Sequence, residues 1–116
     1  MTLKALSIDE VKGDEIMKGA VRKVLVHSKN LMLVYYEVEP GATLSHSHPH
    51  EQMGFVVKGS AELTAGGKTV KLGPGSSYIF DSNEHHGFRI TGKGTIILDV
   101  FHPRRDDYLP KGGQCV

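Results

Sequence analysis

The chain has 116 residues, and its 14 Lys and Arg residues nearly balance 13 Asp and Glu residues, giving a formal net charge of +1 at pH 7. This length suits one domain, and the balance of charge gives no electrostatic reason to expect nucleic acid or an anionic membrane as a partner. No apolar run approaches the roughly 20 residues that span a bilayer, residues 1–15 lack the features of a signal peptide, and the single cysteine, Cys115, excludes an internal disulfide. These absences predict a soluble, cytoplasmic protein.

The first part of the chain changes character at Val21. Residues 1–20 are polar and mixed, without a convincing period, and we expect them to form an extended lead-in. The segments 21–28 and 31–38 are rich in Val, Leu and Tyr, which is typical of strands, and the Ser-Lys-Asn sequence between them is a plausible turn. The sequence therefore predicts two adjacent strands here.

Short β-type segments continue beyond Pro40 and Gly41, separated by Gly, Pro, Asn and Asp at intervals of about ten residues. No helical period of useful length appears, and Pro103 and Pro110 argue against a long helix near the end. The pattern predicts an all-β sandwich or barrel. We expect a single domain over residues 21–109, followed by a C-terminal tail of residues 110–116.

Histidine is concentrated in two places along the chain. Five of the seven histidines fall in two tight clusters, which are His46, His48 and His50, and later His85 and His86. Alternate side chains of an extended strand share a face, so His46 and His48 are expected to point the same way. Two imidazoles on one face can hold a metal ion if another ligand arrives from elsewhere, and the second cluster is the obvious source. The sequence therefore predicts a metal site.

The spacing of these residues resembles the cupin family of small jelly-roll barrels. The first cupin motif is matched by Gly41, four residues, His46-Ser47-His48, three residues, Gln52, six residues and Gly59. The second motif is matched by LGPGSSYIFDSNEHHGF, in which His86 corresponds best to the family's histidine. The resemblance implies an all-β, single-domain cupin jelly-roll barrel. It also implies a divalent transition metal ion held by four ligands, which are His46, His48, Gln52 and His86.

The fourth ligand departs from the usual cupin glutamate. Gln52 occupies the ligand position, and Glu51 stands one place early. A regular strand points Glu51 to the opposite face, which favours Gln52, whereas a bulge after Pro49 would reverse that choice. Neutral ligands leave the full charge of a divalent ion available as a Lewis acid that attracts a carboxylate substrate. They suit Mn, Fe, Co, Ni and Zn comparably, so the metal is left open.

A narrower resemblance lies in HSHPHEQ, EHHGF and LDVFHPRRDDYL. These stretches look like the small cupins of pectin and alginate breakdown, which convert 4,5-unsaturated uronate monosaccharides to open-chain keto forms. The resemblance implies an enzyme with a small sugar-acid substrate, in which Asp99, Phe101 and Arg105 complete the pocket. It also implies a homodimer, for which the apolar strands of Val24–Val38 could supply a sheet edge.

The residues themselves give each of these roles an alternative. Asp99 interrupts the apolar strand TIILDVF and shares a face with Phe101, so it is either an acid or base inside the barrel or an outward-facing carboxylate. Arg105 either binds a carboxylate or balances the acidic residues of a solvated tail. Phe101 either walls the pocket or belongs to the core. Three tyrosines can offer a hydroxyl group to the pocket, and alternation does not choose among Tyr35, Tyr36 and Tyr78.

Two other functions remain compatible with the sequence. The first is a metal-dependent dioxygenase or isomerase that acts on another small molecule, and the neutral Gln52 argues mildly against the dioxygenase. The second is a barrel that binds a small ligand without turnover. Thermal stabilisation by a uronate without reaction would favour the second.

Overall fold

The computed structural model describes residues 3–109. The predicted tail, including Cys115, lies outside these residues. The described part contains ten strands and two short 3-10 turns. In chain order the elements are η1 (Ile8–Glu10), β1 (Asp14–Met17), β2 (Ala20–His27), β3 (Met32–Val38), β4 (Thr43–His46), β5 (Glu51–Lys58), β6 (Ala61–Ala65), β7 (Lys68–Leu72), β8 (Ser77–Phe80), β9 (His86–Ile90), β10 (Thr95–His102) and η2 (Asp106–Tyr108).

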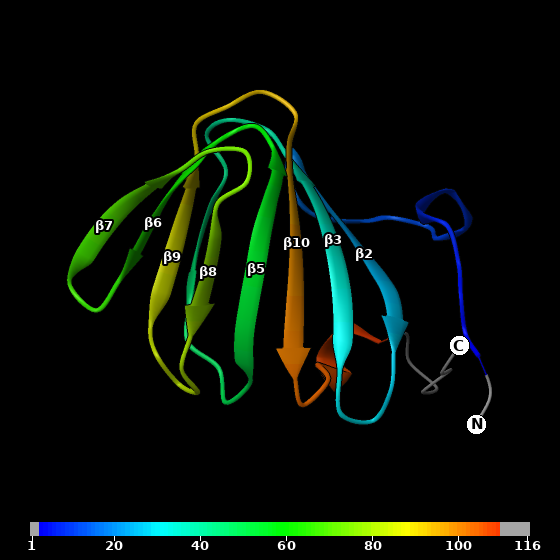
Figure 1. Cartoon of the computed structure of the whole chain (residues 1–116). Coiled ribbons are helices and arrows are strands. Elements are labelled where there is room, and N and C mark those ends of the chain that lie inside the picture. Colours follow the sequence, from blue (N-terminus) through cyan, green and yellow to red (C-terminus); the bar gives the residue numbers. More distant parts are fainter. Residues whose placement is uncertain (1–2, 110–116) are drawn as a thin grey trace.

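The strands form two antiparallel sheets (Figure 1). The larger sheet has six strands in the order β1-β2-β3-β10-β5-β8, and the smaller sheet has four in the order β4-β9-β6-β7. Some strands that follow one another in the sequence, such as β4 and β5, therefore lie in different sheets. This double-sheet arrangement is a jelly roll, so the predicted all-β class is confirmed.

The core lies between the two sheets. In β10 the side chains alternate between buried and half-buried positions, with Ile97 and Phe101 facing inward. The opposite sheet contributes Leu63, Phe88 and Ile90 to the same apolar cluster. Alternation along each strand thus buries one face of each sheet, as expected for packed β-layers.

The register of β10 determines which side chains meet in the interior. This strand lies between β3 and β5 and pairs with both along its length. Asp99 stands opposite Gly54, and Phe101 stands opposite Gln52. On the far side of β5, Gly54 is opposite Tyr78 of β8. Strands β10, β5 and β8 therefore place the polar side chains of Asp99, Gln52 and Tyr78 in neighbouring positions on the inner face of the larger sheet.

Several expectations about local structure differ from the fold. Part of the predicted lead-in, Asp14–Met17, forms β1 and pairs with β2, because its extended backbone finds a partner strand that no local pattern reveals. The division into a lead-in of residues 1–20, a barrel of 21–109 and a tail of 110–116 stays a prediction. The sheet edge expected in the segment Val24–Val38 stays a prediction: β3 is hydrogen-bonded on both sides, but β1 pairs only with residues 20–22 of β2, so residues 24–27 have a strand partner on one side only.

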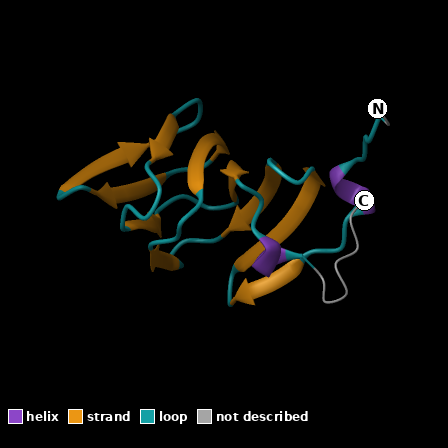
Figure 2. Cartoon of the chain, turned by 90° about the horizontal axis from the view of Figure 1, so that it is seen from below, coloured by secondary structure: helices purple, strands orange, loops and turns teal. Residues whose placement is uncertain are grey.

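Helical structure is minor in the described part of the chain, where only the two short turns occur, as a view from below shows (Figure 2). None of the helices in residues 3–109 is long or apolar enough to cross a membrane. The turn η2 follows β10 directly and carries Tyr108 toward the interior, where it packs against the core.

Candidate metal centre and pocket

Three histidines converge at one end of the barrel interior. His46 ends β4 and is paired in register with His86, the first residue of β9. His48 lies two residues beyond His46, just after the end of β4, and its ring is directed to the same side, as expected from the sequence. The ligand atoms of the three imidazoles lie within 4.8 Å of one another. The arrangement is suited to a single metal ion.

Hydrogen bonds hold two of these rings in one tautomer. His86 Nδ1 lies 2.9 Å from the carbonyl oxygen of Glu84, and His48 Nδ1 lies 2.9 Å from that of His50. A carbonyl oxygen only accepts, so both Nδ1 atoms donate and, in the neutral rings, both Nε2 atoms carry a lone pair. Among the described residues, His86 Nε2 is buried without a hydrogen-bond partner. A metal ion would satisfy this nitrogen, and the backbone carbonyls would orient its ligands.

Gln52 completes the candidate ligand set. Its side chain is 3% exposed, and its Oε1 lies 2.9 Å from His48 Nε2. The amide Nε2 donates to Asp99 Oδ2 at 3.0 Å, which directs Oε1 toward the histidines. Because His48 Nδ1 already carries the ring's proton, His48 Nε2 and Gln52 Oε1 are both acceptors and face each other without a hydrogen atom between them. A cation bound by both atoms would remove this repulsion. Glu51 is exposed at the start of β5, so the geometry favours Gln52.

The cluster keeps its imidazoles unprotonated. Burial, together with the neighbouring rings of His86 and His48, lowers the pKa of His46 to about 4. Burial also lowers the pKa values of His48 and His86, although hydrogen bonds partly oppose that effect. A neutral imidazole is the form that binds a metal ion. The protein environment therefore prepares these residues to act as ligands near neutral pH.

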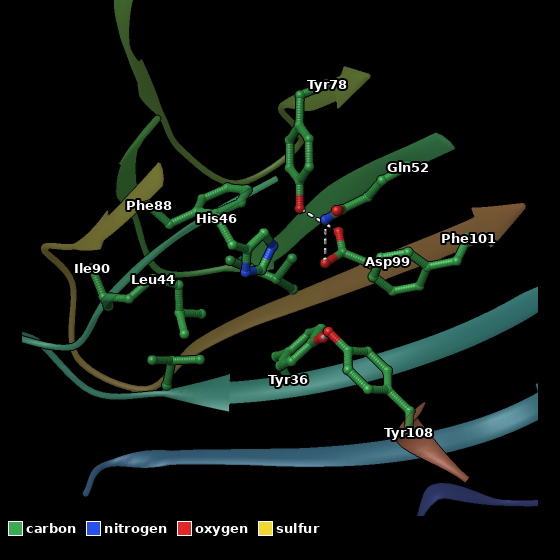
Figure 3. Close-up of a pocket in the computed structure, with 12 residues that line it drawn as sticks. Tyr36, Leu44, His46, Gln52, Tyr78, Phe88, Ile90, Asp99, Phe101 and Tyr108 are labelled. Atoms are coloured by element: carbon green, nitrogen blue, oxygen red, sulfur yellow. Dashed lines mark hydrogen bonds between the residues drawn. The ribbon is translucent and has the colours of Figure 1, made fainter. Parts of the chain in front are cut away.

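Asp99 lies beside this cluster on the inner face of β10. Its side chain is 4% exposed and accepts hydrogen bonds from the Gln52 amide and the Tyr78 hydroxyl (Figure 3). Burial raises the pKa of Asp99 to about 7, although the two hydrogen bonds work against that shift. A carboxyl group that titrates near neutrality can both donate and accept a proton, as a general acid or base requires. The structure thus places Asp99 inside the barrel and excludes the outward alternative.

The pocket itself lies between the two sheets and is lined mainly by apolar and aromatic side chains. Its lining residues are Tyr36, Val38, Leu44, His46, Gln52, Tyr78, Phe88, Ile90, Ile97, Asp99, Phe101 and Tyr108. Phe101 is 1% exposed and contacts the rings of His48 and Tyr108, so it belongs to both the core and the pocket wall. Such a mostly apolar cavity with few polar groups is typical of a small-molecule site.

Arg105 reaches this region from the segment after β10. Its guanidinium lies 4.2 Å from the ring centre of Tyr108 and 5.3 Å from that of Phe101. Its Nε and Nη2 atoms donate to Asp107 at 3.0 and 2.8 Å. Within the described chain, its Nη1 atom is buried and has no hydrogen-bond partner. Arg105 therefore balances an acidic neighbour, as one of the two alternatives expected, while its binding of a substrate carboxylate stays a prediction.

Sequence reasoning left the choice among three tyrosines open and missed two other residues around the pocket. Tyr36 and Tyr78 face inward, whereas Tyr35 lies on the other side of the sheet, and only the register of β3 and β8 separates them. Tyr108 was not considered, because the chain after β10 shows no period that would direct its side chain. Asp107 was treated only as a tail charge.

The remaining histidines lie outside the ligand cluster. His85 is exposed and bonds to Ser45 Oγ at 2.9 Å, opposite in direction to the buried His86. His50 contributes to the site through its backbone carbonyl. Neither side chain belongs to the group of ligand atoms that the structure brings together.

The jelly roll and its interior histidine cluster match a known class of proteins, the cupins. The cupin domain profile matches residues 34–101, and the chain belongs to the cupin family. The pectin degradation protein KdgF of Dickeya dadantii (strain 3937) is 34% identical over 103 residues, which cover 87% of this chain and 94% of that protein. The sequence resemblance to cupins of pectin breakdown is thereby confirmed.

Solved structures agree with this assignment. The structure of KdgF from Halomonas sp. superposes with a TM-score of 0.89 at 31% identity, covering 93% of this chain and all of that one (100%). An RmlC-like cupin from Shewanella frigidimarina NCIMB 400 has a TM-score of 0.86 at 27% identity, covering 93% of this chain and 97% of the other. The similarity therefore extends over nearly the whole of each chain.

Proposed function

We propose that this protein is an enzyme that converts 4,5-unsaturated monouronates to open-chain keto-deoxyuronates, using one divalent metal ion. The observation that carries the proposal is a buried carboxyl group, Asp99, whose pKa of about 7 fits it for proton transfer. It lies beside three converging histidines in a pocket of small-molecule type. Similarity to a pectin degradation protein over most of the chain supports a uronate as the substrate.

The proposed reaction moves one proton and needs no oxidant. The bond between C1 and the ring oxygen breaks, the C1 hydroxyl group loses its proton, and an aldehyde forms at C1. The former ring oxygen leaves as an enolate at C5, which becomes a ketone when C4 gains a proton. Because the proton lost at O1 balances the proton gained at C4, one acid–base residue is sufficient for both transfers.

The residues of the pocket divide this chemistry among them. A divalent ion held by His46, His48, His86 and Gln52 would supply Lewis-acid polarisation of a substrate oxygen. Asp99 takes up and releases the proton. Arg105 offers its Nη1 donor to the substrate carboxylate, while Asp107 keeps the other two donors in place. Phe101 and Tyr108 wall the pocket and limit access of water.

The test is the loss of enol-ether ultraviolet absorbance when metal-loaded protein meets an unsaturated monouronate. We expect a rate well above the spontaneous one, which His48→Ala abolishes and which neither zinc nor nickel restores in that variant. Asp99→Asn should reduce kcat by about 100-fold or more while metal content is retained. Glu51→Gln, on the exposed face, is the matched control and should keep full activity. A wild-type rate equal to the blank would exclude the proposed reaction.

We further propose that the protein forms a homodimer through the outer face of the larger sheet. Exposed apolar side chains gather there, which are Leu31, Met53, Phe55, Val57 and Ile79, each 45–58% exposed. We call this set the outer apolar face. Half-exposed side chains of this kind present on the order of 90 Å² each, so together they offer roughly 450 Å², more than half of the about 800 Å² that each partner of a stable dimer buries.

The charges at the two ends of β5 support a second copy of this chain as the partner that covers the outer apolar face. The strand begins at exposed Glu51 and ends at exposed Lys58. Two-fold packing with antiparallel β5 strands would bring Glu51 of one copy near Lys58 of the other. Light scattering at micromolar concentration should give twice the monomer mass, and a monomer mass would exclude this proposal.

Cytoplasmic localisation stays a prediction.

A further inference from the structure

Tyr78 makes a polar contact that the proposed chemistry does not yet use. It lies on β8 with its side chain directed into the barrel, and its hydroxyl group donates a hydrogen bond to Asp99 Oδ1 (Figure 3). Its ring packs 5.4 Å from that of Phe80 and 5.2 Å from that of Phe88, centre to centre. Burial raises the pKa of Tyr78 well above its usual value, so the hydroxyl group stays protonated and remains a donor.

The contact depends on a glycine in the strand between the two residues. Gly54 of β5 is paired with Tyr78 on one side and with Asp99 on the other. A Cβ atom at this position would overlap both the Tyr78 hydroxyl group and Asp99 Oδ1. The missing side chain therefore leaves the space in which tyrosine and aspartate meet above β5, a use of glycine that explains its place inside a strand.

The two oxygen atoms of Asp99 are both held. Oδ1 accepts from Tyr78, and Oδ2 accepts from the Gln52 amide at 3.0 Å. With both atoms bonded, rotation of the carboxylate breaks at least one contact. The same bond to Oδ2 keeps the Gln52 Oε1 atom turned toward His48, 2.9 Å away. A chain of contacts thus runs from Tyr78 through Asp99 and Gln52 to the histidine cluster.

We propose that Tyr78, given room by Gly54, is a positioning residue that holds Asp99 for proton transfer and, through Asp99, orients the Gln52 amide toward the metal. The first effect rests on the proposed function, because it concerns turnover. The second does not, because it concerns metal binding by the same residues whatever the substrate is.

Tyr78→Phe tests both effects, since it keeps the ring and removes only the hydroxyl group. With the unsaturated monouronate, kcat should fall about tenfold or more while KM changes less than about threefold, because a misplaced acid–base group affects the transition state more than binding. In the protein stripped of metal and titrated with nickel(II), the Kd should rise about threefold to tenfold, somewhat less than for loss of a group in direct contact with a ligand.

Gly54→Ala provides an independent perturbation of the same contact. It should reproduce the fall in kcat and the rise in nickel Kd, because its Cβ displaces the tyrosine–aspartate pair. The double variant should be less impaired than the product of the single effects, since both substitutions break one contact. Matched controls are Tyr35→Phe, on the opposite face of the sheet, and Gly73→Ala, where a Cβ meets nothing within 4 Å. Both should behave as wild type.

The outcomes separate this inference from the proposed function. If the wild type turns over the uronate and Tyr78→Phe keeps its kcat and its nickel Kd, the positioning role is refuted. If the wild type shows no turnover, the proposed reaction fails, and the nickel titration alone decides the inference, with an unchanged Kd refuting it. A lower melting temperature of Tyr78→Phe with unchanged kcat and Kd would reduce Tyr78 to a packing residue and also refute it.

Discussion

Where β8, β5 and β10 lie side by side, polar side chains join the apolar core on the inner face of the larger sheet, and apolar side chains are exposed on its outer face. The inner face carries Gln52, Asp99 and Tyr78 on neighbouring strands, and their polar atoms are bonded to one another. The outer face of the same strands carries Met53 and Ile79, which are 50% and 58% exposed. Stable sheets ordinarily bury their apolar face, so both faces of this region depart from what folding alone would favour.

The difference shows which forces each face serves. Burial of a carboxyl group destabilises its ionised form, and on the inner face this penalty falls on Asp99, whose pKa is raised to about 7. Exposed apolar side chains on the outer face gain free energy only when another surface covers them. This contrast fits the proposals that the inner face binds a ligand and that the outer face binds a second copy.

The largest effect should come from removing a proposed metal ligand that faces the inner face from the smaller sheet. His86→Ala removes a buried ligand whose Nε2 has no partner among the described residues, and we expect the nickel affinity to fall by more than about 100-fold. Isothermal titration of the metal-free protein measures this loss. His85→Ala, an adjacent exposed histidine, is the control and should bind nickel as the wild type does. Equal losses in both variants would contradict the ligand assignment.

A second prediction concerns the penalty for burying Asp99. Its pKa is about 7 in the folded protein against 3.8 as its ordinary value, so its stabilisation is fully present below pH 3.8 and is lost as the pH rises through 7. Asn at this position has no such loss. The free energy of unfolding of metal-free Asp99→Asn should therefore increase relative to wild type between pH 4 and 8, by up to about 4 kcal/mol.

Urea unfolding at a series of pH values measures this difference. His46, with its pKa lowered to about 4, works in the opposite direction, because its stabilisation is present above pH 6.5 and lost as the pH falls through 4. That contribution occurs in both proteins and cancels in the difference. Asp14→Asn, at an exposed position of β1, is the control. A difference that does not change with pH would show that Asp99 is ionised without penalty.

A charged substitution on the outer apolar face should weaken the proposed dimer. Phe55→Lys places an ammonium group in the centre of the outer apolar face, and we expect the dimer Kd to rise about 10-fold to 100-fold because each copy adds an unpaired, desolvated cation to the interface. Analytical ultracentrifugation measures the Kd. Val70→Lys, on β7 of the other sheet and 48% exposed, should leave it unchanged. If Val70→Lys dissociates the dimer and Phe55→Lys does not, the interface lies elsewhere.

The smallest expected effect, a change in kcat, comes from replacing the amide of Gln52 on the inner face by a carboxylate. Gln52→Glu keeps the shape of the side chain but places a second carboxylate beside Asp99, at the position of a 3.0 Å hydrogen bond. Two such groups share a proton, so we expect kcat to fall about tenfold while nickel still binds. A steady-state rate measurement with Glu51→Gln alongside tests this. An unchanged kcat would mean that the amide donor does not matter to Asp99.

The local pattern of the sequence was sufficient for much of this structure. Short β-type segments between glycines and prolines predicted the strands from β2 to β10 closely, because alternation and turn residues act over a few positions. The spacing of His46, Gln52 and Gly59 predicted the family, which the domain match and the KdgF relatives confirm. The short strand β1 escaped, since it depends on pairing with β2 and not on its own composition.

What only the tertiary structure decided concerns residues that meet across strands and loops. The pairing of β4 with β9 brings His86 beside His46, forty positions away in the sequence. Register alone places Gly54 between Tyr78 and Asp99 and puts Tyr35 on the opposite face from Tyr36. Cross-strand register joins residues tens of positions apart, and one sequence carries no record of that pairing. The amino-acid sequence by itself therefore determined the strands and the set of candidate ligands, and the packing of the two sheets decided which side chains touch.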